Sequence, residues 1–293
     1  MFTYPKTHLT ETRRGPVELS RFGSRSGPAI LSLHGGMGGC DQGSLLAMSA
    51  FADWQNLDII APARPGYLST PIKGRQSLEQ QADLFAALLD SEAIESATLI
   101  AISAGGPSAI TFAARHPDRC KRLILISACS GHLPTKRQIF VALAIMKLAA
   151  RSDKLVSWMK RKVEQDPWRA ASRSIPDPDL IEQTLTHPEA GPYMQALQTS
   201  IYDRMAERLP GTICDTRAFA GPMPLSFDRI KAPTLIIHGD KDRIVPFDHA
   251  QNASEAIKTS RLHRIPGADH VALFTHMDEI RQATASFMTN EEQ

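Results

Sequence analysis

The sequence predicts an α/β fold, in which a mainly parallel sheet carries helices on its faces. Short apolar, branched segments alternate with segments of helical periodicity over residues 1–130, and the same alternation resumes after residue 227. Strands and helices that alternate in this way wind into a parallel sheet. The interval between the two stretches has helical periodicity alone. Because strands of the same type resume after it, this interval is interpreted as an insertion into one fold.

The chain therefore divides into a core of residues 1–130 and 228–293 and a helical cap of residues 131–227. The expected core strands are 29–34, 57–61, 97–102, 122–127, 234–238 and 261–265. The expected core helices are 43–54, 77–92, 105–115, 247–257 and 275–288. Proline-rich breaks separate the expected cap helices, which are 137–150, 153–165, 178–186 and 192–208.

Composition excludes several classes of protein. The 293 residues have a net charge of +2 and an apolar fraction of 42%, so no global field favours nucleic acid. The N-terminus lacks the apolar run of a secretory signal, and no stretch reaches the length of a membrane span, so a cytoplasmic protein is expected. The four cysteines form no CxxC pair and are expected as reduced thiols, and no metal-binding spacing occurs.

Ser103 is the candidate nucleophile. It follows the expected strand 97–102 and opens a helix rich in small residues, the setting of a sharp turn that presents a serine hydroxyl above a sheet. Ala101 replaces the first glycine of the GxSxG pattern. Taken alone, a serine here is equally compatible with a helix N-cap.

A glycine loop at residues 34–39 (HGGMGG) follows the expected strand 29–34. Glycines let backbone N–H groups approach a ligand closely, as an oxyanion hole requires. The expected donors are Gly36, with Met37 as an alternative, and Ala104. A phosphate loop or a plain turn would also fit, although no Gly-Lys-Ser/Thr follows to favour a Walker loop.

A carboxylate and an imidazole follow two later strands. Asp242 lies in GDKDRIVP after strand 234–238, and His270 ends the sequence GADH after the next strand. A serine hydroxyl needs an imidazole to accept its proton and a carboxylate to orient that imidazole. Asp240 and Asp269 are competing carboxylates in the same loops.

These motifs together resemble the α/β-hydrolase superfamily over nearly the whole chain. The HGG loop, RPGY at 64–67, the turn at Ser103, GDKDRIVP and GADH match that family in kind and order. The resemblance implies a mostly parallel eight-stranded sheet, first strands within 6–22, a helical cap after the sixth strand and a Ser/His/Asp triad. Family spacing favours Asp242 over Asp240 as the acid.

The expected function is hydrolysis of a small or medium apolar ester through an acyl-enzyme on Ser103, with no cofactor. Three large cap residues, Phe140, Met146 and Trp158, are candidate substrate contacts. A prolyl iminopeptidase-type peptidase or amidase is an alternative, although Met37 replaces the proline of its HGGPGG pattern. A carbon–carbon bond hydrolase and a non-catalytic small-molecule receptor also stay open. Epoxide hydrolases and dehalogenases are disfavoured because their nucleophile is an aspartate.

The expected partner is a small-molecule substrate, without nucleic acid or stable membrane insertion, and the sequence does not specify the oligomeric state. Between Lys136 and Lys162 the cap interleaves basic and apolar residues. Such a pattern is compatible with a membrane surface. A solvated helix face is the favoured interpretation.

Overall fold

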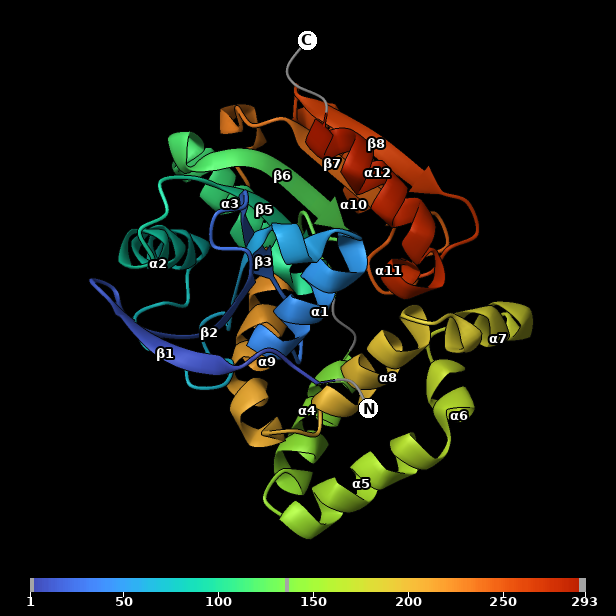
Figure 1. Ribbon diagram of the computed structural model, residues 1–293. Coiled ribbons are helices and arrows are strands. Elements are labelled where there is room, and N and C mark those ends of the chain that lie inside the picture. The colour runs from blue at the N-terminus through green and yellow to red at the C-terminus, as the bar shows by residue number, and fades with distance from the viewer. Residues whose placement is uncertain (1–2, 135–136, 290–293) are drawn as a thin grey trace.

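The computed structural model describes residues 3–134 and 137–289, and eight strands in these ranges form one sheet (Figure 1). The strand order is β1-β2-β4-β3-β5-β6-β7-β8. β2 runs antiparallel to both of its neighbours, and all later neighbours are parallel. The predicted mostly parallel, eight-stranded sheet is therefore confirmed. The strands are β1 Thr7–Thr12, β2 Gly15–Gly23, β3 Ala29–Leu33, β4 Asp58–Pro62, β5 Ala97–Ile102, β6 Cys120–Ile126, β7 Thr234–Gly239 and β8 Ser260–Ile265.

Both faces of the sheet are covered, because successive strand residues point to opposite sides. Leu31 belongs to the apolar cluster under helices α2, α3 and α10, whereas its neighbour Ile30 belongs to the cluster under α1, α11 and α12. The helices of the core are α1 Cys40–Ala50, α2 Leu78–Ser91, α3 Gly106–Arg115, α10 Asp248–Ala256, α11 Ala272–Thr275 and α12 Met277–Thr289. A capping box between Ser77 and Gln80 starts α2, as predicted.

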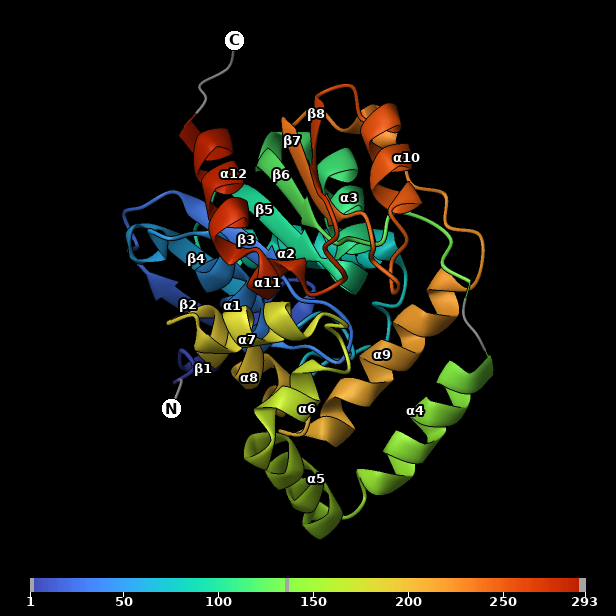
Figure 2. The same cartoon turned by 90° about the vertical axis from the view of Figure 1, so that its right-hand side faces the viewer.

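In the described part of the chain, six α-helices between β6 and β7 lie together on one side of the core (Figures 1 and 2). α7 and α8 pack on the core cluster that also contains α1. The remaining cap helices share an apolar cluster of their own, with Leu143, Val163 and Leu209 among its buried members. The six are α4 Arg137–Ala149, α5 Asp153–Gln165, α6 Pro167–Ala171, α7 Pro178–Thr186, α8 Ala190–Ser200 and α9 Met205–Phe219. The segment boundaries at 131 and 227 stay predictions.

One predicted cap helix is wrong. The expected helix 192–208 is two helices, because α8 ends at Ser200 and the chain turns before Met205. Arg204 has a φ of 53°, a left-handed conformation that a continuous helix does not contain. α9 then continues to Phe219 with Pro210 in its interior, where proline normally interrupts a helix. The short helix α6 begins in the expected break 166–167 and continues through residues for which no helix was expected.

Candidate active site

Ser103 lies in a strained turn directly after β5. Its φ of 52° is left-handed, a region that costs energy for residues with a Cβ atom. Small residues permit the turn: a Cβ atom on Gly105 would lie 2.7 Å from the carbonyl oxygens of Leu33 and His34. On Gly106 it would lie 2.3 Å from the oxygen of Cys129. The turn is therefore packed tightly between the chain segments that leave β3 and β6.

A chain of hydrogen bonds joins Ser103, His270 and Asp242. Ser103 Oγ lies 3.0 Å from His270 Nε2, and His270 Nδ1 lies 2.8 Å from Asp242 Oδ2. The three side chains leave the carboxyl ends of β5, β8 and β7, which the parallel arrangement brings to one edge of the sheet. The structure thus brings together the serine, imidazole and carboxylate that the sequence singled out.

Asp242 is held as a carboxylate by four donors. The backbone N–H groups of Ile244 and Val245 each donate to its Oδ1 at 2.9 Å. His238 Nε2 lies 3.3 Å from Oδ2 and donates to the carbonyl of Val245 at 2.9 Å. Burial raises the pKa of Asp242, but the hydrogen bonds from His238 and His270, the charge of His270 and the N–H of Val245 together lower it below its ordinary value. The ionised carboxylate accepts the Nδ1 proton of His270, which leaves Nε2 free to accept the proton of Ser103.

The competing carboxylates have other partners. Asp240 accepts hydrogen bonds from Arg264 and from the N–H of Gly267. Asp269 accepts bonds from Arg243 and from the backbone N–H of His270. Among the described residues, neither carboxylate is bonded to the His270 ring, so Asp242 is the acid that the geometry favours.

The glycine loop lies against Ser103. A Cβ atom on Gly35 would lie 3.2 Å from the Cβ atom of Ser103. Among the described residues, the backbone N–H of Gly36 has no acceptor, whereas the N–H of Met37 donates to Thr212 Oγ1 at 3.0 Å. Ala104, the third expected donor, follows Ser103 in the short 3-10 turn Ser103–Gly105. Gly36 and Ala104 are thus better placed than Met37 to bind an incoming oxygen.

Comparison with known proteins places these features in a family. A family model described as alpha/beta hydrolase fold matches residues 28–277. The chain belongs to the α/β-hydrolase family.

Two proteins and one solved structure are similar to this α/β-hydrolase over most of its length. An uncharacterized hydrolase, YcgS of Bacillus subtilis, is 30% identical over 251 residues, which cover 83% of this chain and 84% of that one. A 2-hydroxymuconate semialdehyde hydrolase of Pseudomonas putida is 23% identical and covers 89% of this chain and 86% of its own length. The structure of an alpha/beta hydrolase fold protein from Nakamurella multipartita has a TM-score of 0.78 at 28% identity, covering 96% and 98%.

In this α/β-hydrolase a buried arginine supports the glycine loop. Arg64, which is 1% exposed, donates through Nε to the carbonyl of His34 and through Nη2 to that of Gly35. Its backbone N–H donates to His34 Nε2 at 2.9 Å, which fixes the proton of His34 on Nδ1, where it bonds the carbonyl of Gly35. Burial and the charge of Arg64 lower the pKa of His34, so the ring stays neutral. Asp215 of α9 neutralises Arg64 at 2.6 Å.

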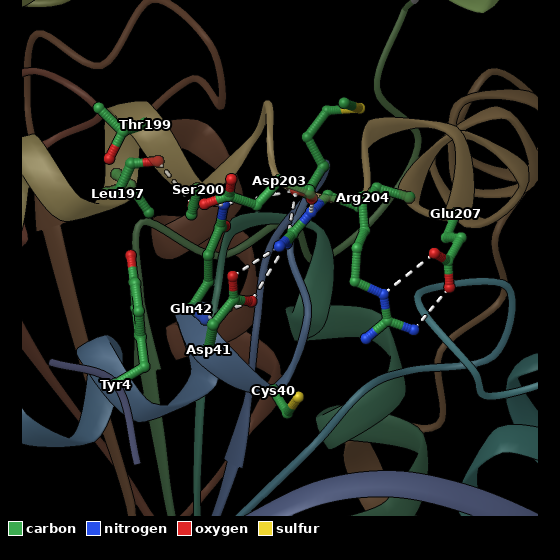
Figure 3. A network of polar contacts seen from close by, with 12 residues as sticks. Tyr4, Cys40, Asp41, Gln42, Leu197, Thr199, Ser200, Asp203, Arg204 and Glu207 are labelled. Atoms are coloured by element: carbon green, nitrogen blue, oxygen red, sulfur yellow. Dashed lines mark hydrogen bonds and ion pairs between the residues drawn. The ribbon is translucent and has the colours of Figure 1, made fainter. Parts of the chain in front are cut away.

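The cap is also tied to the start of α1, directly after the loop. Arg208 of α9 forms an ion pair with Asp41 at 2.6 Å. Gln42 donates to Ser200 Oγ at 2.9 Å, and both Gln42 and Arg208 lie within hydrogen-bond distance of the carbonyl of Met37. Figure 3 shows Asp41, Gln42 and Ser200 in this network. Hydrogen bonds and an ion pair therefore join the cap to the glycine loop and to the start of α1.

Sequence reasoning missed His238, Arg64 and the α9 residues that support the site. His238 stands four residues before Asp242, and Arg64 begins the quoted RPGY turn, so both were within recognised motifs. The helical spacing of Arg208, Thr212 and Asp215 could have indicated one face of a helix. It could not have indicated what that face contacts.

The expected substrate contacts lie on α4 and α5. Phe140 is 36% exposed and Trp158 is 51% exposed, whereas Met146 is partly buried in the cap cluster that also contacts Met37. Trp158 also lines a cavity with Lys162 and Tyr202. The substrate-binding roles of Phe140, Met146 and Trp158 stay predictions.

Proposed function

We propose that this α/β-hydrolase is a serine hydrolase that cleaves a small or medium apolar ester. Ser103 Oγ attacks the carbonyl carbon while His270 Nε2 accepts its proton, and His270 then donates that proton to the departing alcohol. Water, deprotonated by the same nitrogen, attacks the acyl-enzyme and releases the acid. The hydrogen-bonded order of Ser103, His270 and Asp242 is the observation that carries this proposal.

The oxyanion of the tetrahedral intermediate would be bound by the N–H groups of Gly36 and Ala104. Each such donor contributes about 2.7–4 kcal/mol to transition-state stabilisation. Met37 is a weaker candidate because Thr212 already accepts its N–H. The strained φ of Ser103 supports the same assignment, because strain of this kind clusters at active sites.

The proposal that the substrate is apolar rests on the apolar side chains between the glycine loop and the cap. The side chain of Met37 packs against the cap cluster, together with Met146 and Met159. A pocket bounded by these thioethers would favour an apolar acyl or alcohol group, since methionine fills irregular apolar surfaces.

Labelling with a fluorophosphonate and turnover of a short-chain p-nitrophenyl ester test the proposal together. The wild type is expected to label and turn over, and Ser103→Ala to lose both. Ser157→Ala, an exposed serine on α5, is the matched control and is expected to keep both. A wild type that neither labels nor turns over a panel of esters, amides and diketones would favour the receptor alternative instead.

Carbon–carbon bond hydrolysis is the second candidate, because the Pseudomonas putida relative is named as a semialdehyde hydrolase. The same serine, imidazole and oxyanion donors would serve an acyl transfer that releases a carbon leaving group. The ratio of kcat/KM for a vinylogous diketone to that for an ester separates the two reactions, since it compares transition-state binding. An ester preference supports the first proposal, and a diketone preference the second.

A further inference from the structure

Helix α4 is apolar and almost unburied. Leu143 is its one buried residue, although most of its side chains are aliphatic or aromatic. Ile145 is 63% exposed and Leu148 is 65% exposed. The other large exposed apolar side chains of α4 are Ile139, Phe140 and Val141. A water-soluble protein seldom exposes so continuous an apolar surface without a partner for it.

The exposed apolar surface continues onto α5, where Leu155 and Trp158 are exposed one helical turn apart. Both views place α5 at the end of the cap farthest from the sheet, with α4 rising from it (Figures 1 and 2). We call α4 and α5 together, residues 137–165, the α4–α5 surface.

The α4–α5 surface is strongly basic. It contains seven basic and two acidic residues, a net charge of +5, whereas the whole chain has +2. The basic residues are Arg137, Lys147, Arg151, Lys154, Lys160, Arg161 and Lys162. The rest of the molecule is therefore net acidic, and positive charge is concentrated where apolar side chains are exposed.

A cavity beside α4 combines the same two properties. It has a volume of about 430 Å³, lies between α4 and α9, and is floored by apolar residues such as Leu209 and Ile213. Lys147, Arg151 and Arg217 stand on its rim. Within the described part of the chain, none of the three has a carboxylate in ion-pair range. Apolar floor and basic rim match a ligand with an anionic head and a hydrocarbon tail.

We propose that the α4–α5 surface binds the face of a lipid bilayer that contains anionic lipids. Exposed apolar side chains of α4 would enter the headgroup boundary, while the flanking Lys and Arg side chains pair with lipid phosphates. Among residues 3–134 and 137–289, the structure contains no helix that could span a bilayer.

Charge decides between a bilayer and a second copy of the chain. Two α4–α5 surfaces packed face to face would oppose net charges of +5, which repel one another. An anionic bilayer complements that charge and also accepts the apolar side chains. Nucleic acid would satisfy the charge but leave the apolar side chains in water.

Co-sedimentation of the full chain with vesicles tests the proposal. The wild type is expected to bind vesicles of equimolar phosphatidylglycerol and phosphatidylcholine, and to bind phosphatidylcholine alone much more weakly. Binding to the anionic vesicles should weaken as salt is added, because the phosphate contacts are screened. Equal binding to both vesicle types, or no binding to either, overturns the proposal.

Two pairs of variants separate the apolar and the basic contributions. Ile145→Ser with Leu148→Ser removes exposed apolar contact, and Leu9→Ser, 52% exposed on β1, is its matched control. Lys147→Gln with Arg151→Gln removes two charges from the surface, and the exposed pair Lys73→Gln with Lys258→Gln is the control. Because each basic residue near an anionic surface contributes about 1 kcal/mol, removing two should weaken the vesicle partition coefficient by about thirtyfold.

Oligomeric state and turnover of a soluble ester are measured on the same samples. The surface variants are expected to hydrolyse that ester at the wild-type rate and to elute at the wild-type size. Loss of vesicle binding in both surface variants, but in neither control, supports the proposal. Wild-type vesicle binding by the variants overturns it, as does a wild-type dimer that the Ile145→Ser, Leu148→Ser change converts to a monomer.

Discussion

Thr212 Oγ1 accepts a hydrogen bond from the backbone N–H of Met37 at 3.0 Å, across 175 residues of chain. Thr212 lies on cap helix α9, and Met37 lies in the glycine loop beside Ser103. Arg208 and Asp215 flank Thr212 on the same face of α9 and bind Asp41 and Arg64. One helix face therefore sets the position of the loop that is proposed to bind the oxyanion.

Replacing Thr212 with Val is expected to lower kcat while leaving KM nearly unchanged. The variant keeps the shape of the side chain but removes the acceptor, so the loop shifts and the Gly36 donor is misplaced. A misplacement of this kind costs about tenfold to a hundredfold in rate. Thr216→Val, one turn along α9, is the control, because Thr216 Oγ1 donates to the carbonyl of Thr212 within the same helix. Equal rates for the two variants would contradict this role for α9.

Replacing Asp215 with Asn is expected to destabilise the fold. Arg64 is 1% exposed, and the change would leave its charge buried without a carboxylate. Breaking a buried ion pair from one side costs about 3–5 kcal/mol in the free energy of unfolding. Lys160→Gln, which breaks the more exposed pair with Asp203, should cost about 1 kcal/mol or less. Urea unfolding measures the free energy of unfolding of both variants. Similar losses in the two would contradict the claim that the buried charge of Arg64 depends on Asp215.

Stability at low pH should depend on Asp242. Its folded-state pKa is depressed below the ordinary 3.8, so its contribution is present above that value and is lost as pH falls through the folded pKa. Asn cannot titrate. The difference in unfolding free energy between the wild type and Asp242→Asn should therefore narrow as the pH falls from about 5 to about 3. A difference in unfolding free energy that stays constant or widens over that range contradicts a depressed folded-state pKa for Asp242.

Gly105→Ala should destabilise the turn at Ser103. Its Cβ atom would lie 2.7 Å from two carbonyl oxygens that cannot move without shifting β3. Forcing a methyl group into such a site costs about 1–3 kcal/mol. Gly131→Ala, whose Cβ atom would meet nothing within 4 Å, is the control for thermal unfolding. Equal melting temperatures for both variants would show that the turn is less tightly packed than these distances imply.

Local patterns in the sequence predicted most of the core. The strand at 97–102 has the predicted bounds, and the Ser77 capping box starts α2, because both depend on residues close together in the chain. Ser103, Asp242 and His270 were found through their places after strands, since parallel strands bring their carboxyl ends to one edge.

The features of the fold and of the site that the sequence did not predict depend on contacts between residues far apart in the chain. The expected helix 192–208 continued past Arg204 because its helical periodicity is uninterrupted there. The left-handed backbone at Arg204 is not marked by a glycine in the sequence. Arg64 and Asp215 are 151 residues apart, and a single buried ion pair has no periodic pattern. Long-range partners of this kind are fixed by how the cap sits on the core, which no local pattern records.

The structure of a fluorophosphonate adduct tests the central claim most directly. The phosphorus should be bonded to Ser103 Oγ, with its oxygen about 2.7–3.1 Å from the N–H groups of Gly36 and Ala104. The N–H of Met37 should still donate to Thr212. An adduct on any other residue, or a phosphonyl oxygen bound away from Gly36 and Ala104, would contradict the account.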